Sequence, residues 1–298
     1  MRKPGDLPLA LPRRGFTTAQ AISAGVGKNR LRSADVQHPF RGINLLSPGP
    51  VELESRCRAL QEKLPAGARF CGLTAARLVG VPLPARLAWS SEVHVAVPRG
   101  NRTLVGTSIR GHTFLPTPGD TRDWHGLRIS SPERIWCEVA RDLTLVELVM
   151  AGDFLVHHRL PHTTIDRISR EVDRWPGRRG ARNLAAAAPL LDPASESPQE
   201  SRLRVLLTLG GIGGLVANLE IVTTDGFRYR ADLAIPEKRL VIEYQSDQFH
   251  GHEVRRADLT RKSRIEADRW YVMEVGAADL DDPDELCRRI LRILASRP

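Results

Sequence analysis

The sequence predicts an α+β protein in three parts, because helical and strand patterns are mixed along the chain and change character twice. Residues 13–50 contain two short helical segments and a basic hairpin, and residues 51–190 mix amphipathic helices with strands. Residues 195–298 follow an α-β-β-β-α-β-α order. A break containing Pro and Ser, Ser195 to Pro198, marks the last boundary. The 298 residues suffice for two or more separate cores.

The excess of basic over acidic residues indicates which kind of molecule the protein binds. With 44 Lys and Arg against 35 Asp and Glu, the chain carries a formal charge of +9, which favours a polyanion, nucleic acid before an anionic membrane. We find no apolar run of about 20 residues and no signal-type segment, so we expect a cytoplasmic protein that does not bind membranes. The four widely spaced cysteines indicate neither a disulfide framework nor a zinc knuckle.

The first part has the pattern of a small winged helix-turn-helix. Thr17 or Thr18 caps a predicted helix through Ala24, and a second helix is expected from about Lys28 to Asp35. Residues 40–46 then read as a hairpin around Arg41-Gly42. In such a module the second helix enters the major groove of DNA. The residues expected to face DNA are Lys28, Asn29, Arg30, Arg32 and Arg41. The alternative is a module that only packs against protein.

This segment, GFTTAQAISAGVGKNRLRS, resembles the N-terminal winged helix of AbiEi-type antitoxins, and residues 51–190 resemble the region that follows it in that family. The resemblance implies DNA binding and a toxin or other protein as partner. The middle region contains no catalytic constellation. Its histidines have no metal-ligand spacing, so we interpret them as structural or surface residues: His94, His112, His125, His157, His158 and His162.

The most informative stretch is YRADLAIPEKRLVIEYQSDQFHGH, Tyr229 to His252. We expect two strands, 228–235 and 240–244, joined by a four-residue turn that begins at Pro236. A hairpin of this kind places Asp232 directly opposite Glu243, with Cβ atoms roughly 5 Å apart. Gln245 lies two residues further along and is expected on the same face.

Two carboxylates that face each other repel, and a bound divalent cation usually neutralises this repulsion. Carboxylate and amide oxygens suit Mg²⁺ (or Mn²⁺), which can activate a water and neutralise charge on a phosphate. We therefore predict a metal-dependent phosphodiesterase site in which Asp232 and Glu243 bind the ion and Gln245 orients the water or donates its carbonyl. Taken singly, each acidic residue could also be an ordinary solvated side chain.

The D…ExQ spacing resembles the PD-(D/E)XK nuclease superfamily, with Gln245 where Lys is more frequent. The phrase DLAIPEKRLVIEYQSDQFHGH is also similar to the very-short-patch-repair (Vsr) endonuclease family. That resemblance implies that Asp232 is the metal-binding Asp and that His250 is the catalytic His. Gln245 replaces another His of that family, and the family's structural zinc has no visible ligand set here.

Two helices flank the predicted site. The first begins at Ser197 and Pro198, and Glu200 is its capping-box residue. In the folds that this segment resembles, an acidic residue on this helix also approaches the metal. Both roles of Glu200, helix cap and neighbour of the metal, therefore stay open. The second helix follows His250. Its basic face, with Arg255, Arg261 and Lys262, is expected to contact phosphates, and solvated surface is the alternative.

Together these features predict a DNA-binding protein with an endonuclease-like, Mg²⁺-dependent domain that hydrolyses phosphodiester bonds, with double-stranded DNA as the expected partner. The absence of Lys at position 245 favours the alternative of a non-catalytic, antitoxin-like transcriptional regulator. A toxin that cleaves RNA is a third hypothesis.

Overall fold

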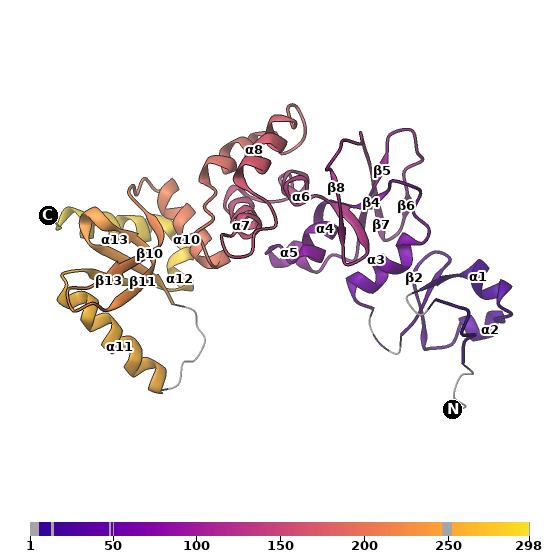
Figure 1. Cartoon of the computed structure of the whole chain (residues 1–298), viewed down its shortest axis with the longest axis horizontal. Coiled ribbons are helices and arrows are strands. Elements are labelled where there is room, and N and C mark those ends of the chain that lie inside the picture. The colour runs from indigo at the N-terminus through magenta and orange to yellow at the C-terminus, as the bar shows by residue number, and fades with distance from the viewer. Residues whose placement is uncertain (1–5, 13–14, 48, 50, 246–251, 298) are drawn as a thin grey trace. The chain divides into compact units, whose positions relative to one another are not determined.

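The computed structural model describes residues 6–12, 15–47, 49, 51–245 and 252–297, and of residues 252–259 it describes the backbone alone. The chain forms two compact units, Met1–Val139 and Ala140–Pro298 (Figure 1). Both contain helices and β-sheet, so the predicted α+β class is confirmed. The division between the two units lies within the predicted middle region, 51–190.

The first unit begins with a three-stranded sheet of order β1-β3-β2 and two short helices. Thr17 caps the first helix as expected: its hydroxyl accepts from the Gln20 N–H at 3.0 Å, and the Gln20 side chain accepts from the Thr17 N–H at 2.7 Å. The predicted turn at Arg41-Gly42 is confirmed. The elements are β1 (Phe16–Thr17), α1 (Thr18–Ser23), α2 (Lys28–Leu31), β2 (Val36–Phe40) and β3 (Ile43–Leu46).

Helix α2 is shorter than predicted. It ends at Leu31 instead of Asp35, because Arg30 donates both terminal nitrogens to the Asp35 carboxylate at 2.9 Å and draws the following residues into a turn.

The rest of this unit is built on a mixed six-stranded sheet of order β6-β7-β5-β4-β9-β8. Arg69 at its centre is fully buried and donates to the Asp120 carbonyl at 2.7 Å, with its guanidinium carbon 3.8 Å from the centre of the Phe114 ring. The elements are α3 (Leu53–Gln61), β4 (Arg69–Phe70), α4 (Gly72–Val79), α5 (Ala85–Ala88), β5 (Val93–Pro98), β6 (Val105–Gly106), β7 (Ile109–Phe114), β8 (Thr121–Trp124), β9 (Leu127–Ser130) and α6 (Pro132–Val139).

The second unit opens with helices that lead into the C-terminal sheet. Thr144 begins the first of them with a capping box to Glu147. These helices are α7 (Leu145–Val156), α8 (Ile165–Asp173), α9 (Ala181–Ala187), the 3₁₀ turn η1 (Ala188–Leu190) and α10 (Pro198–Leu209). Helix α10 packs along α7 and carries Glu200 at its start.

A four-stranded sheet of order β10-β11-β12-β13 forms the centre of this unit. The first three strands are antiparallel, and β13 runs parallel to β12. The hairpin strands have the predicted limits, and Leu233 pairs with Ile242, as the expected register requires. The elements are β10 (Val216–Val222), β11 (Arg228–Ile235), η2 (Pro236–Lys238), β12 (Leu240–Tyr244), α11 (His252–Ala267), β13 (Tyr271–Val275), α12 (Ala277–Asp281) and α13 (Pro283–Ala295).

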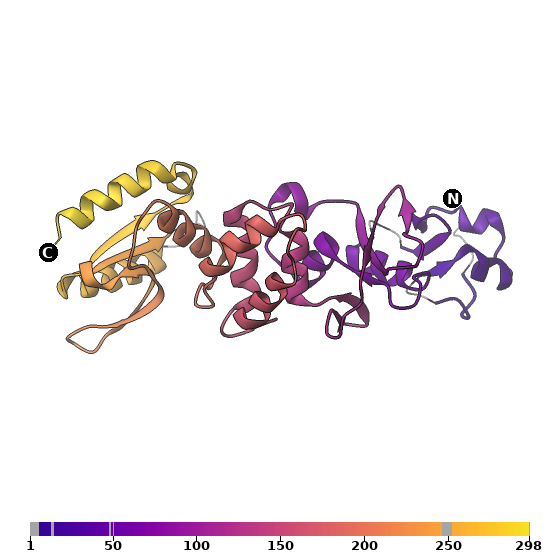
Figure 2. The same cartoon turned by 90° about the horizontal axis from the view of Figure 1, so that it is seen from above.

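Two separate cores cover the two faces of this sheet. Leu203 of α10 and Ile290 of α13 pack with Ile242 on one face, whereas Ile265 of α11 packs with Val241 on the other. Figure 2 shows α13, in yellow, lying along its side of the sheet. In the described ranges, no helix has the length and apolar character needed to cross a membrane.

Candidate functional site

The site forms where β11 and β12 lie side by side beneath α11. Because Leu233 pairs with Ile242, the register places the preceding Asp232 opposite Glu243. Glu243 lies on the α11 side, since Val241, two residues earlier, belongs to the α11 core. One Asp232 oxygen, Oδ2, accepts the backbone N–H of Tyr244 at 2.9 Å. The hairpin thus brings both predicted metal ligands together.

Tyr229 and Arg261 complete this side of the site. The Tyr229 hydroxyl donates to Oε1 of Glu243 at 2.9 Å. The Arg261 guanidinium carbon lies 4.6 Å from the centre of the Tyr229 ring, and its NH2 group donates to the Arg230 carbonyl at 3.2 Å. Arg261 therefore fixes the ring that orients Glu243. Sequence reasoning predicted Arg261 as a phosphate contact and did not identify Tyr229.

Glu200 reaches the site from the start of α10. The Ser197 hydroxyl accepts the Glu200 N–H at 3.1 Å, so the predicted cap is confirmed. The reciprocal capping-box bond is displaced by one residue, because the Glu200 carboxylate accepts from the N–H of Glu196 at 3.0 Å instead of from Ser197. The same oxygen accepts from the side-chain amide of Asn218 at 2.8 Å. Glu200 thus serves both as part of the helix start and as a neighbour of Asp232, whose pKa its charge raises.

Asn218 is an unusual residue in the middle of strand β10. The pairs Ala217↔Leu233 and Leu219↔Ala231 on either side place it opposite Asp232. Its φ of +51° lies in the left-handed region, which Asn tolerates better than other non-glycine residues. Opposite Asn218, the alternation of side chains between the two faces of β11 is interrupted. Residues two apart on a regular strand point to the same face, but Ala231 belongs to the α11 core and Leu233 to the core on the opposite face. This irregularity brings Tyr229 onto the same face as Glu243.

Replacing Asn218 should therefore destabilise the site measurably. Asn218→Ala loses the bonds to Glu200 and to the Ala194 carbonyl, and it leaves at positive φ a residue without the polar side chain that makes Asn tolerant of this conformation. We expect a loss of about 3 kcal/mol in the free energy of unfolding, measured by urea titration. Asn218→Gly accepts the backbone conformation and should lose about 1 kcal/mol less. Equal losses in the two variants would show that the backbone conformation is not strained.

Asp232 and Glu243 lie where their ionised forms are disfavoured. Burial, together with the Asp232 charge, raises the pKa of Glu243 to about 7, although the Tyr229 hydrogen bond opposes the increase. Burial also raises the pKa of Asp232; the Tyr244 N–H opposes this and the Glu200 charge adds to it. Within the described part of the chain, neither of them nor Glu200 forms an ion pair with Lys, Arg or His. Other acidic residues of this unit are paired, such as Glu196 with Arg230 and Asp279 with Arg289.

This donor set fits a hard divalent cation. Asp232 Oδ1 accepts no hydrogen bond from any described residue. The Glu243 carboxylate accepts from the Tyr229 hydroxyl and from the backbone N–H of Asp232, and because a carboxylate has about four acceptor sites, it can still bind a cation. Oxygen-only ligands, few in number and partly exposed to water, match the preference of Mg²⁺. Bound Mg²⁺ would also relieve the repulsion that raises both pKa values.

The remaining predicted residues around this site are placed as follows. The side chain of Gln245 is exposed, and its backbone N–H donates to the Val275 carbonyl at 2.8 Å. Lys262 Nζ lies 3.4 Å from Oε1 of Glu274, on the strand next to Glu243. His250 lies outside the described residues, and so does the side chain of Arg255, although the backbone of Arg255 belongs to α11.

In the first unit, the residues predicted to face DNA differ in exposure. Lys28, Asn29, Arg32 and Arg41 are exposed. Arg30 is half-buried and bound to Asp35, so its main role in the structure is to close the turn after α2.

One group of metal-ligand residue types arises outside the predicted site. Ligand atoms of His157, His158 and Glu196 lie within 4.8 Å of one another. The Glu196 carboxylate already contacts Arg159 at 3.1 Å and forms an ion pair with Arg230. Although burial acts in the opposite direction, the Arg230 hydrogen bond and charge hold the pKa of Glu196 below its usual value. Two guanidinium groups on the only carboxylate of this group disfavour a cation there.

Comparison with known proteins leaves the function open. No family model matches the chain. The uncharacterized proteins Rv2248 and MT2308 of two Mycobacterium tuberculosis strains are each 28% identical over 171 residues, which is 57% of this chain and 62% of the relative. The chain therefore matches less than two thirds of their length. The crystal structure of the RV2827C protein from M. tuberculosis has a TM-score of 0.38 and 16% identity, over 64% of this chain and 75% of that chain.

Proposed function

We propose that this protein is a metal-dependent nuclease that hydrolyses phosphodiester bonds in DNA. The observation that carries the proposal is the group of Glu200, Asp232 and Glu243, which forms no ion pair among the described residues of a chain with 44 Lys and Arg, although the charge of Arg261 acts on Asp232 and Glu243. In a basic protein, three neighbouring acids without ion pairs favour a bound cation. The order of α10, β10, β11, β12, α11 and β13 supports the resemblance to PD-(D/E)XK nucleases.

Each residue of the site has a definite task in this proposal. Asp232 and Glu243 hold Mg²⁺ or Mn²⁺, with Glu200 beside them. The bound ion supplies an activated water and neutralises charge on the phosphate. Tyr229 holds the Glu243 carboxylate in place, and Arg261 holds the Tyr229 ring. Gln245 orients the attacking water, and His250 acts as general acid or base.

The first unit supplies DNA binding in this proposal. Two short helices and the hairpin of β2 and β3 support a winged helix-turn-helix, with Lys28, Asn29, Arg32 and Arg41 toward DNA. A non-catalytic, antitoxin-like regulator is the second candidate. Gln245 favours it, because PD-(D/E)XK nucleases more often carry Lys there.

The test is cleavage by purified protein. Plasmid, short duplex, single-stranded DNA and RNA are incubated with Mg²⁺, Mn²⁺ or EDTA. We expect metal-dependent cleavage of DNA that Asp232→Asn lowers by more than about 100-fold, since loss of even an outer-shell partner of a metal ligand costs 10- to 100-fold. Glu220→Gln is the matched control, because Glu220 is an exposed acid of the same sheet that pairs with Arg228.

Three outcomes separate the hypotheses. Cleavage that survives in Asp232→Asn contradicts the proposed site. No cleavage by the wild-type protein, together with retained duplex binding, supports the regulator. Cleavage of RNA alone supports the toxin-like nuclease.

A further inference from the structure

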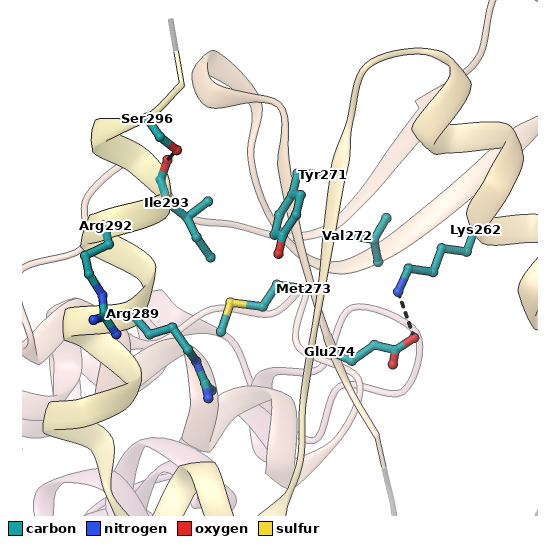
Figure 3. Close-up of a pocket in the computed structure, with 9 residues that line it drawn as sticks. All are labelled: Lys262, Tyr271, Val272, Met273, Glu274, Arg289, Arg292, Ile293 and Ser296. Atoms are coloured by element: carbon teal, nitrogen blue, oxygen red, sulfur yellow. Dashed lines mark hydrogen bonds and ion pairs between the residues drawn. The ribbon is translucent and has the colours of Figure 1, made fainter.

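A groove runs along the edge of strand β13 that pairs with no other strand among the described residues. This strand is the last in the sheet order, and its outer side borders a hollow of about 650 Å³ (Figure 3). Helix α13 forms one wall of the hollow with Ile293 and Arg289, and Tyr271 and Met273 contribute apolar surface from the strand. Lys262 of α11 borders it on the other side of the strand.

The charges that line the groove itself are balanced. Lys262 pairs with Glu274, Arg289 with Asp279 and Arg292 with Glu285. These ion pairs leave little net charge along the middle of the groove. Any net positive charge must therefore come from residues at its ends.

Four cationic residues, Lys238, Arg239, Arg269 and Arg297, lie close together near the start of β13, because the Arg297 side chain binds the backbone of the other three. Arg297 donates to the carbonyls of Lys238, Arg239 and Arg269, and its guanidinium carbon lies 5.7 Å from the centre of the Tyr271 ring. In the part of the chain described, none of these four residues forms an ion pair. Arg239 and Arg269 are exposed, and Tyr271 is 44% exposed beside them. This basic end therefore attracts an anion next to an accessible aromatic ring.

The other end of the groove reaches Glu274, on the strand next to Glu243. Tyr271 pairs with Leu240 at the start of β13, and Glu274 pairs with Glu243 near its end. At about 3.3 Å per residue, the five residues of β13 span roughly 16 Å. A chain lying in the groove would thus pass from the basic end to the neighbourhood of Asp232 and Glu243.

We propose that the β13 groove binds an extended single-stranded segment of nucleic acid. The basic end holds its phosphates, and Tyr271 stacks on a base, as is general for proteins that bind single strands. The inference rests on the proposed nuclease in one respect: the segment is the substrate strand, separated from its complement beside the site. A strand edge also accepts peptides, but four cationic residues that form no ion pair in the described part of the chain, close to the exposed Tyr271, favour the polyanion.

The test measures binding of a fluorescent oligo-dT by anisotropy in EDTA, where no metal-dependent cleavage takes place. Arg239→Ala/Arg269→Ala should weaken binding at least about 10-fold and reduce the salt slope by about 1.4, at roughly 0.7 per lost phosphate contact. Tyr271→Ala should weaken binding about 10-fold with a smaller change in salt slope, and Tyr271→Phe should retain it. Arg288→Ala is the matched control, since Arg288 lies on α13, is exposed and pairs with Glu285.

Unchanged oligo-dT binding in both the double variant and Tyr271→Ala, with unchanged melting temperatures, would overturn the proposal. Binding of acidic peptides that oligo-dT does not displace would do so as well and would assign the groove to a protein partner. Cleavage and binding are separate readouts. Oligo-dT binding that depends on the groove, without metal-dependent cleavage, contradicts the nuclease alone; cleavage without such binding contradicts the groove alone.

Discussion

Glu243→Gln should raise the stability of the metal-free protein while it removes metal-dependent cleavage. The pKa of Glu243 is raised to about 7 because the carboxyl is buried beside Asp232, so the ionised form destabilises the fold. Gln keeps the shape, can still accept the Tyr229 hydrogen bond and carries no charge. At about pH 8 in EDTA, we expect the variant to be more stable by up to about 3 kcal/mol, which raises the melting temperature by several degrees.

The difference in stability between the two proteins should depend on pH in a defined direction. A carboxyl whose pKa rises from 4.5 in the unfolded chain to about 7 in the fold binds its proton more tightly when folded. Its contribution to stability is therefore complete below pH 4.5 and is lost as the pH increases through 7. Thermal melts from about pH 4 to pH 8 in EDTA should show wild-type stability decreasing across this window relative to Glu243→Gln, with the two proteins converging at the acidic end.

Bound metal should make the wild-type protein more stable than Glu243→Gln. At a Mg²⁺ concentration about 1,000 times its dissociation constant, the wild-type protein gains about 4.1 kcal/mol, which exceeds the advantage of the variant in EDTA, and the variant, which lacks a ligand, gains much less. Glu274→Gln is the control, because Glu274 occupies the paired position on β13 but is exposed and bound to Lys262. If Glu243→Gln proved less stable than the wild type at every pH, the carboxylate would have a structural role, and the metal site would be contradicted.

The sequence predicted the hairpin of this site well because local rules determine it. The Pro236 to Arg239 turn and the apolar alternation around it define both strands, and the turn length then determines which residues face each other. Helix α13 is also defined by local rules, since Asp282 and Pro283 mark its start and its apolar stripe is regular. Helix α2 was predicted too long, because the Arg30–Asp35 bond that ends it has no sequence signature.

The hydrogen bond from Tyr229 to Glu243 could not be predicted from the alternation of side chains along a strand. In a regular strand, Tyr229 and Asp232 point to opposite faces, so Tyr229 was not expected near Glu243. The positive φ of Asn218 and the changed alternation opposite it bring them together. The one available signal was Asn in the middle of the apolar strand 216–222, where that residue is disfavoured unless its conformation is unusual. Long-range contacts such as Glu200 with Asn218 require the tertiary structure.

Arg204→Met should destabilise the second unit by about 3–5 kcal/mol, because it leaves a buried charge without its partner. The Arg204 NH2 group donates to Asp153 Oδ2 at 2.7 Å between α10 and α7, and both side chains are less than a tenth exposed. Burial already raises the pKa of Asp153 while the Arg204 charge lowers it. Without Arg204, Asp153 should take up a proton to fold. The variant should therefore gain stability relative to the wild type as the pH falls, measured by urea titration at several pH values.

A double variant separates the cost of the unpaired charge from the value of the pair. Arg204→Met/Asp153→Leu replaces both groups with apolar ones and should recover most of the loss, since buried pairs contribute little net stability compared with well-packed apolar residues. Arg202→Met is the control, because Arg202 lies on the same helix and pairs with the exposed Asp281. Arg204 lies one turn after Glu200 on α10, so the buried pair also holds the helix that presents this acid to Asp232. If the double variant regains stability but loses metal binding, the pair is retained to position Glu200; if metal binding also returns, α10 is positioned by its apolar packing alone.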